Sequence, residues 1–224
     1  MLKRLLFIHV FVVCCLSSYA QKDWYIGTNA SNTIIRPIGG GLYIAPEIRY
    51  KKDKVMPFFV VGYESVFTDK KDSKTQISEY ASKGFFTRVG IDFMPRKKSF
   101  DRGGFTVGLG LTYSIFQEKV KYEFEGNAFP GYLGKSERKN ISSITGDIHY
   151  GYWWNRKNWM FYLGATHGLS LPSGIPQGEE SAFPSYYMVG SGINIATSQK
   201  NRNWNPIFTS SIEFKVFFKI SPKE

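Results

Sequence analysis

The chain has 224 residues, a formal net charge of +11, 17% aromatic residues and two cysteines. No linker or block of like charge divides this length, so we expect a single domain. Its basic residues form short clusters at expected turns rather than one stripe, which argues against a nucleic-acid partner, and two cysteines cannot build a disulfide scaffold.

The first 20 residues have the anatomy of a secretory signal peptide. Lys3 and Arg4 precede an apolar run over 5–16, and small residues fill the cleavage positions before Gln21. That run is shorter than the roughly 20 residues that a membrane-spanning helix needs. Both cysteines lie within it. Removing 1–20 takes away two basic residues and no acidic one, so the net charge falls from +11 to +9. We therefore expect export of the chain.

Beyond this segment the dominant pattern is a strict alternation of residue types. In residues 105–115, FTVGLGLTYSI, the odd positions are apolar and the even positions are Gly, Thr or Ser. A period of two over such a length predicts a β-strand with one apolar face. The pattern recurs, and we expect no helix after the signal peptide. The predicted strands cover 24–35, 40–51, 57–68, 80–95, 103–119, 141–155, 158–170 and 206–219.

Long strands without helices leave edges that must be paired, and closure into a barrel pairs them. The polar faces are rich in Gly, Thr and Ser, which suits a narrow lumen, and aromatic residues lie near the ends of the apolar faces, as in interfacial girdles. The sequence therefore predicts an all-β fold: one antiparallel up-and-down transmembrane β-barrel of about eight strands over residues 21–224. A soluble barrel with the inverted pattern is the alternative.

The expected connections differ in length at the two ends of this barrel. Those at 52–56, 96–102 and 156–157 are short, whereas three of the four at the other end, 36–39, 69–79, 120–140 and 171–205, are long. Short periplasmic turns and long extracellular loops are typical of outer-membrane barrels. The segment 171–205, with its prolines and tyrosines, suggests a folded-over segment that contacts a partner.

Five segments carry a resemblance to a known group of proteins. They are YASKGFFTRVGIDF (80–93), GGFTVGLGLTYSIF (103–116), YWWNRKNWMFYLG (152–164), FPSYYMVGSG (183–192) and FTSSIEFKVFFKI (208–220). The sequence resembles small outer-membrane β-barrels of the Bacteroidetes, PorT-like or OmpX-like eight-stranded barrels of unknown function. The resemblance implies an eight-stranded barrel in the outer membrane of a Gram-negative envelope, and it brings no catalytic residue.

Nine ionisable residues fall on the polar faces of the predicted strands. An eight-stranded barrel has an interior that side chains fill, and buried charges are tolerated when they are paired. We therefore predict a structural network in the lumen, with a small passive pore as the alternative. Arg88 and Asp92 share a face but lie about 13 Å apart, so each needs a partner on another strand, Glu64 or an acid across the lumen in the case of Arg88. The predicted network comprises Glu47, Arg49, Glu64, Arg88, Asp92, Asp147, His149, Glu213 and Lys215.

The sequence offers weak candidates for catalysis and for metal binding. Asp147 and His149 share a face, and Ser170 lies on the next strand with His167, but no sharp motif accompanies them and His167 falls on the apolar face. No histidine has an acidic partner four residues away. We expect no catalytic residue, no metal and no cofactor.

The closing strand, 206–219, has the features of a recognition signal for the barrel-insertion machinery. Its apolar face carries Ile212, Phe214, Val216 and Phe218. We expect a non-enzymatic integral outer-membrane barrel that acts as a structural or accessory component of an envelope complex for assembly, secretion or surface display. Its expected partners are outer-membrane lipid, lipopolysaccharide and an envelope protein. A lipid-modifying outer-membrane enzyme and a small passive pore are the alternatives.

Overall fold

The computed structural model describes residues 23–38, 40–68, 77–94, 103–124, 132–173, 187–190, 192–194 and 207–220. The expected signal peptide over 1–20 lies outside these ranges. Almost all of the described chain is β-strand. The strands are β1 (Asp23–Asn29), β2 (Leu42–Ile44), β3 (Pro46–Lys51), β4 (Val55–Thr68), β5 (Ile77–Phe93), β6 (Gly103–Phe124), β7 (Tyr132–Arg156), β8 (Trp159–Ser173), β9 (Tyr187–Met188), β10 (Gly192–Asn194) and β11 (Ile207–Lys219), and the helix is α2 (Ala30–Ile38).

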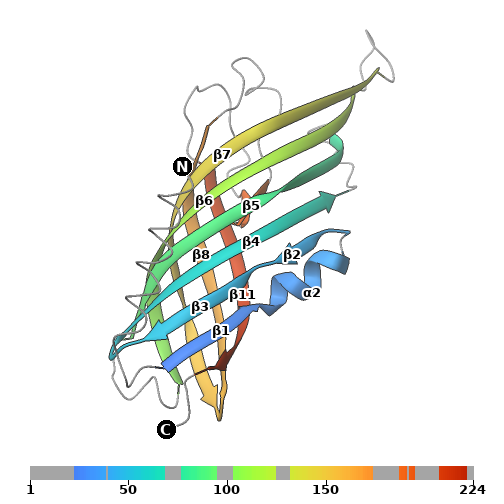
Figure 1. Cartoon of the computed structure of the whole chain (residues 1–224). Coiled ribbons are helices and arrows are strands. Elements are labelled where there is room, and N and C mark those ends of the chain that lie inside the picture. The colour runs from blue at the N-terminus through green and yellow to red at the C-terminus, as the bar shows by residue number, and fades with distance from the viewer. Residues whose placement is uncertain are drawn as a thin grey trace, which may run out of the picture.

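The strands close into one antiparallel up-and-down barrel. Neighbours pair in the order β1, β3, β4, β5, β6, β7, β8 and β11, and β1 pairs with β11 to complete the wall (Figure 1). β2 also pairs with β4 and continues the line of β3 beyond a break at Ala45, so β2 and β3 together form one interrupted strand of the barrel wall. The barrel therefore has eight strands, and the predicted all-β fold class is confirmed.

Alternation along each strand separates a lumen face from an outward face. In β6 the odd positions from Phe105 to Ile115 are between 41% and 53% exposed, whereas Thr106, Thr112 and Ser114 are buried. The same alternation places Phe85, Val89, Ile148 and Leu163 on the outside, among many other large apolar side chains. We call this outward apolar surface the apolar belt. The strand faces rich in Gly, Thr, Ser and charged residues thus point inward and the large apolar side chains of the belt point outward, the reverse of the pattern expected for a soluble barrel.

The first predicted strand, 24–35, is wrong in its second half, and so is the expectation that no helix follows the signal peptide. β1 ends at Asn29, whose side-chain oxygen accepts a hydrogen bond from the Asn32 backbone N–H (3.2 Å) and so caps α2. The helix stops where Gly40, at φ 77°, turns the chain back and the Gly41 N–H donates to the Arg36 carbonyl (2.8 Å). No helix among the described residues is long and apolar enough to span a membrane.

α2 fills the part of the wall that β1 does not reach. It packs against β11 and β2 (Figure 1), and the Phe214 backbone N–H, just beyond the part of β11 that pairs with β1, donates to the Ser31 hydroxyl (3.2 Å). Ile34, Ile35 and Ile38 are exposed on the helix. The helix therefore substitutes for the missing half-strand, and its isoleucines extend the apolar belt.

Two long connections contain more strand than predicted. The segment expected as a loop over 120–140 holds the ends of β6 and β7, which run on to Phe124 and from Tyr132 and project beyond the neighbouring strands in Figure 1. The segment 171–205 contains the end of β8 and a short β9–β10 hairpin, with β10 paired to β11. We call this end of the barrel the extended end. The opposite end, with the tight turn at 157–158, is the turn end.

Candidate functional site

The lumen is filled by side chains in successive layers. An apolar layer lies toward the turn end, charged residues come next, hydroxyl groups follow, and a second apolar layer lies toward the extended end, as the paired positions along β6, β7 and β8 place them. The turn-end layer is Tyr25, Met56, Met94, Trp153, Met160, Tyr162 and Phe217, and the extended-end layer is Tyr43, Ala45, Phe58, Val60, Phe86, Phe116, Ile141, Val189 and Ile207. The hydroxyl layer includes Thr112, Ser114, Ser143, Thr145, Ser170 and Thr209.

Eight of the nine predicted network residues form one closed circuit, which we call the charge ring. Each member contacts the next, acids and bases alternate, and all eight side chains are buried. Four strands, β3, β5, β7 and β11, each direct two of these side chains into the lumen. In order the charge ring is Glu47, Arg49, Asp92, His149, Asp147, Arg88, Glu213 and Lys215, and it returns from Lys215 to Glu47.

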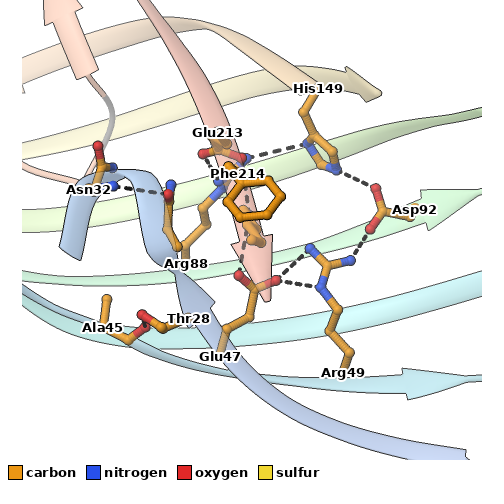
Figure 2. Close-up of polar contacts among 12 residues, drawn as sticks. Thr28, Asn32, Ala45, Glu47, Arg49, Arg88, Asp92, His149, Glu213 and Phe214 are labelled. Atoms are coloured by element: carbon orange, nitrogen blue, oxygen red, sulfur yellow. Dashed lines mark hydrogen bonds and ion pairs between the residues drawn. The ribbon is translucent and has the colours of Figure 1, made fainter. Parts of the chain in front are cut away.

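One half of the charge ring is centred on Arg49. Its Nε donates to Glu47 Oε1 at 2.5 Å, and its Nη1 donates to Asp92 (Figure 2). The other oxygen of Asp92, Oδ1, lies 2.7 Å from His149 Nε2. Figure 2 shows Asp92 between the guanidinium and the imidazole. One aspartate therefore links two bases that come from different strands.

The other half is centred on Arg88. Its Nη2 and Nε donate to the two oxygens of Asp147, at 2.5 and 3.2 Å, in a bidentate pair, and its Nη1 donates to Glu213 Oε1 at 3.3 Å. Lys215 Nζ then lies 3.1 Å from Glu213 Oε2 and 3.2 Å from Glu47 Oε2, which closes the circuit. Arg88 thus finds acids on β7 and β11 rather than Glu64.

His149 completes the alternation of charge. Its Nδ1 lies 3.0 Å from Asp147 Oδ1, and its Nε2 faces Asp92. Nδ1 also lies 3.3 Å from Arg88 Nη2, so each ring nitrogen faces a carboxylate and Nδ1 faces a guanidinium N–H as well. With His149 protonated the charge ring has four acids and four bases and no net charge, the condition under which buried charges are tolerated.

Aromatic rings pack against the cations of the charge ring. The Arg49 guanidinium carbon lies 4.6 Å from the centre of the Phe58 ring and 4.7 Å from that of Trp153. Arg88 and Lys215 lie 5.4 and 5.8 Å from the same Phe58 ring. These distances allow cation–π attraction and leave the cations little room for water.

Glu64, the ninth predicted residue, lies outside the charge ring and joins three parts of the barrel. Its Oε1 accepts from Arg36 Nε of α2 (3.1 Å), and its Oε2 accepts from the Gly190 backbone N–H at the tip of the β9–β10 hairpin (2.9 Å). Val189, beside Gly190, is fully buried in the extended-end layer. The hairpin tip therefore plugs that end of the lumen. A cavity of about 20 Å³ lies between Glu64 and the charge ring, enough for about one water molecule.

The weak catalytic candidates are not brought together. Ser170 hydrogen-bonds to Ser143 and Thr145, at 2.6 and 2.8 Å, in the hydroxyl layer, and His149 is engaged by aspartates in the charge ring. His167 faces outward on β8, on the opposite side of the wall from Ser170.

The outward contacts of His167 were not predicted. Its Nδ1 lies 3.2 Å from the Ser210 hydroxyl, and its Nε2 lies 3.1 Å from the Tyr150 hydroxyl. The sequence signal for this set was a lone ionisable residue among apolar outward positions. Arg36 was also missed, because 24–35 was expected to be a strand that ended before it.

The predicted insertion residues lie on the outward face of β11. Ile212 is 76% exposed and Phe218 40%, and Phe214 and Val216 are half-buried between their neighbours. Phe214 continues a stack of rings with Phe161 and Trp154, with centroids 6.4 and 5.6 Å apart along the stack. These four residues therefore form a continuous part of the apolar belt.

Neither a metal site nor a known relative assigns a function to the barrel. Within the described ranges no group of three or more His, Cys, Asp or Glu side chains is placed to hold a metal ion. No family model matches the chain, and comparisons with curated proteins and with solved structures find no match. The barrel and its charge ring are thus interpreted from their own geometry.

Proposed function

We propose that this protein is an integral barrel of the bacterial outer membrane and a structural or accessory component of an envelope complex for assembly, secretion or surface display, and that its filled lumen has a non-enzymatic, structural role. The observation that carries the proposal is the combination of an outward apolar belt with a lumen filled by a closed ring of paired, buried charges. A surrounding lipid bilayer explains the outward apolar belt, and a rigid structural barrel explains the filled lumen. The signal peptide expected over 1–20 and the resemblance to PorT-like barrels support the same location.

The packed lumen favours an accessory role over a passive pore. The charge ring lies between two apolar layers, and the hairpin tip at Val189 and Gly190 covers the extended end. An ion crossing this path would have to separate paired charges and then cross two apolar layers.

We accordingly expect the purified barrel, reconstituted into planar bilayers, to give no steady ion conductance. A matched variant with Glu213→Ala and Lys215→Ala removes one acid and one base from the charge ring. Its conductance is the comparison for an opened lumen. Steady conductance of the unmodified protein at neutral pH would support the pore instead.

The location has a direct test. After cell fractionation the protein is expected in the outer-membrane fraction, released by detergent and not by high salt, and its unheated form is expected to migrate differently from its boiled form in gel electrophoresis. A protein recovered from the soluble periplasm without detergent contradicts the proposal.

The partner is an envelope protein together with lipid and lipopolysaccharide, and the barrel-insertion machinery is a transient partner of β11. Affinity purification from cells treated with a crosslinker is the experiment that identifies the stable partner. A chain recovered free of any envelope protein, at the same crosslinker dose that captures a known outer-membrane complex, argues against the accessory role.

A further inference from the structure

A polar set of three side chains lies on the outside of the wall, within the apolar belt. It comprises Ser210 on β11, His167 on β8 and Tyr150 on β7. Ser210 and His167 are direct cross-strand partners, and Tyr150 lies diagonally from His167, with ring centroids 5.7 Å apart. We call this set the outer triad. Its geometry is therefore fixed by strand register and not by a mobile loop.

The described outward neighbours of the outer triad on β7, β8 and β11 are apolar. Every other outward position between Trp159 and Leu171 of β8 is apolar, and His167 is exposed. Ile148 flanks His167 on β7. Further exposed apolar neighbours on the same face are Leu169, Phe208 and Ile212. An ionisable side chain on a membrane-facing surface is costly, and such residues mark functional sites.

The outer triad has the arrangement of an activated nucleophile. A hydroxyl lies within hydrogen-bond reach of a base, at 3.2 Å, and a third group, at 3.1 Å, orients the base through its other nitrogen. For His167 to act as the base, Nδ1 accepts from the Ser210 hydroxyl while Nε2–H donates to the Tyr150 oxygen. A neutral imidazole satisfies both contacts.

The depth of the outer triad indicates the substrate. His167 is eight residues from Trp159, which is near the turn end, and four residues from Leu171, which is near the other edge of the belt. At a rise of about 3.3 Å per residue, His167 therefore lies closer to the edge of the belt at the extended end. Long connections at that end place it in the outer leaflet under the proposed orientation. Acyl esters of membrane lipids lie near this boundary, where their chains enter the hydrocarbon.

We propose that the outer triad hydrolyses acyl esters of outer-leaflet lipids, an activity added to the accessory role. The inference rests on the membrane location proposed above, and it confines the non-enzymatic description to the lumen. The site lies on the wall itself, so a lipid reaches it by lateral diffusion and need not enter the barrel.

The reaction has two balanced steps. Ser210 Oγ attacks the ester carbonyl carbon as its proton passes to His167 Nδ1, the bond from that carbon to the alcohol oxygen breaks, and the proton moves from Nδ1 to the departing oxygen. Water then attacks the acylated Ser210, gives a proton to Nδ1, and releases the fatty acid as Ser210 Oγ recovers that proton. The sum is ester plus water giving alcohol plus carboxylic acid, with Nε2–H held by Tyr150 throughout.

The test uses the full chain, purified in detergent and checked for folding by its heat-dependent gel migration. Mixed micelles carry either a phospholipid or lipid A, so the two arms distinguish the two sources of acyl ester, and released fatty acid is measured by mass spectrometry. A fluorophosphonate probe, with the adduct located by peptide mass spectrometry, reports directly on the reactivity of Ser210.

We expect Ser210→Ala and His167→Gln to lower the rate by about 100-fold or more, the range of a lost general base or nucleophile, with Tyr150→Phe giving a smaller loss. The matched control is Ser173→Ala, because Ser173 is a serine at the end of β8 outside the outer triad, exposed and hydrogen-bonded to Ser142 at 2.7 Å. Equal rates for Ser210→Ala and the unmodified protein overturn the proposal. So does a folded protein that neither releases fatty acid in either arm nor labels Ser210, and this outcome leaves the membrane location standing, because fractionation tests that separately.

Discussion

Replacement of Arg88 by leucine is expected to lower the free energy of unfolding by about 3–5 kcal/mol, the cost of breaking a buried ion pair. Arg88 is 5% exposed and pairs with Asp147 and Glu213 inside the charge ring. Leucine leaves both carboxylates without this cation in a lumen that admits little water. The measurement is urea-induced unfolding of the folded protein in lipid vesicles, followed by tryptophan fluorescence and by gel migration.

Two comparisons isolate the origin of this effect. Lys119→Leu removes a cation from an ion pair with Glu137 (3.3 Å) in which both side chains are substantially exposed, and it is expected to change stability by less than about 1 kcal/mol. Arg88→Leu combined with Asp147→Asn restores the charge balance and is expected to recover part of the loss. If Arg88→Leu alone unfolds within about 1 kcal/mol of the unmodified protein, the charge ring does not stabilise the barrel.

The sequence was sufficient to predict most of the wall and the position of the charge-ring residues inside the lumen. Alternation assigns each residue of β5, β6, β7, β8 and β11 to one face, and barrel closure makes one of these faces the lumen. Charges such as Arg49, Asp92 and Glu213 therefore had to lie inside. Their pairing was not predictable in the same way, because it depends on strand tilt and on contacts across the lumen. Arg88 consequently pairs with Asp147 and Glu213, and Glu64 pairs with Arg36.

The missed elements have two physical causes. α2 is fixed by the Asn29 cap and by the left-handed Gly40, both local features that an apolar–polar period does not register. Toward their ends, β6 and β7 carry charged residues on the exposed face, such as Lys119, Lys121 and Glu137, where the apolar belt has ended. Without an apolar outward face, the apolar–polar alternation that predicts a strand is lost.

The outer triad was missed for a third reason. His167 was recognised as an outward residue, but its partners lie on two other strands and depend on the registers of β8 with β7 and β11. Sequence reasoning instead joined it to Ser170 on its own strand, which faces the other way. A lone ionisable residue in an apolar outward run is therefore a better signal than the spacing of candidate catalytic residues.

Phe214→Arg is expected to reduce the free energy of folding into lipid vesicles by about 2–4 kcal/mol and to lower the yield of inserted barrel in cells, the cost of a lipid-facing charge at mid-depth. Phe214 lies near the middle of β11 on its outward face, beside Phe161 and Trp154. Arginine there must hold its guanidinium in hydrocarbon or bend away from the wall, and it also loses the ring contacts. Folding yield by gel migration and urea titration in vesicles are the measurements.

The same substitution at another depth distinguishes a lipid effect from a general packing loss. Ile220 follows the end of β11 at the turn end and is 49% exposed, so Ile220→Arg can reach the interface and is expected to cost only about 0–1 kcal/mol. Phe214→Leu keeps the site apolar and is expected to cost less than about 1.5 kcal/mol. A graded loss, large for Phe214→Arg and small for the other two, means that the apolar belt faces hydrocarbon. Equal and small losses for both arginine variants mean that the apolar belt faces water or protein, and this result contradicts the proposed membrane location.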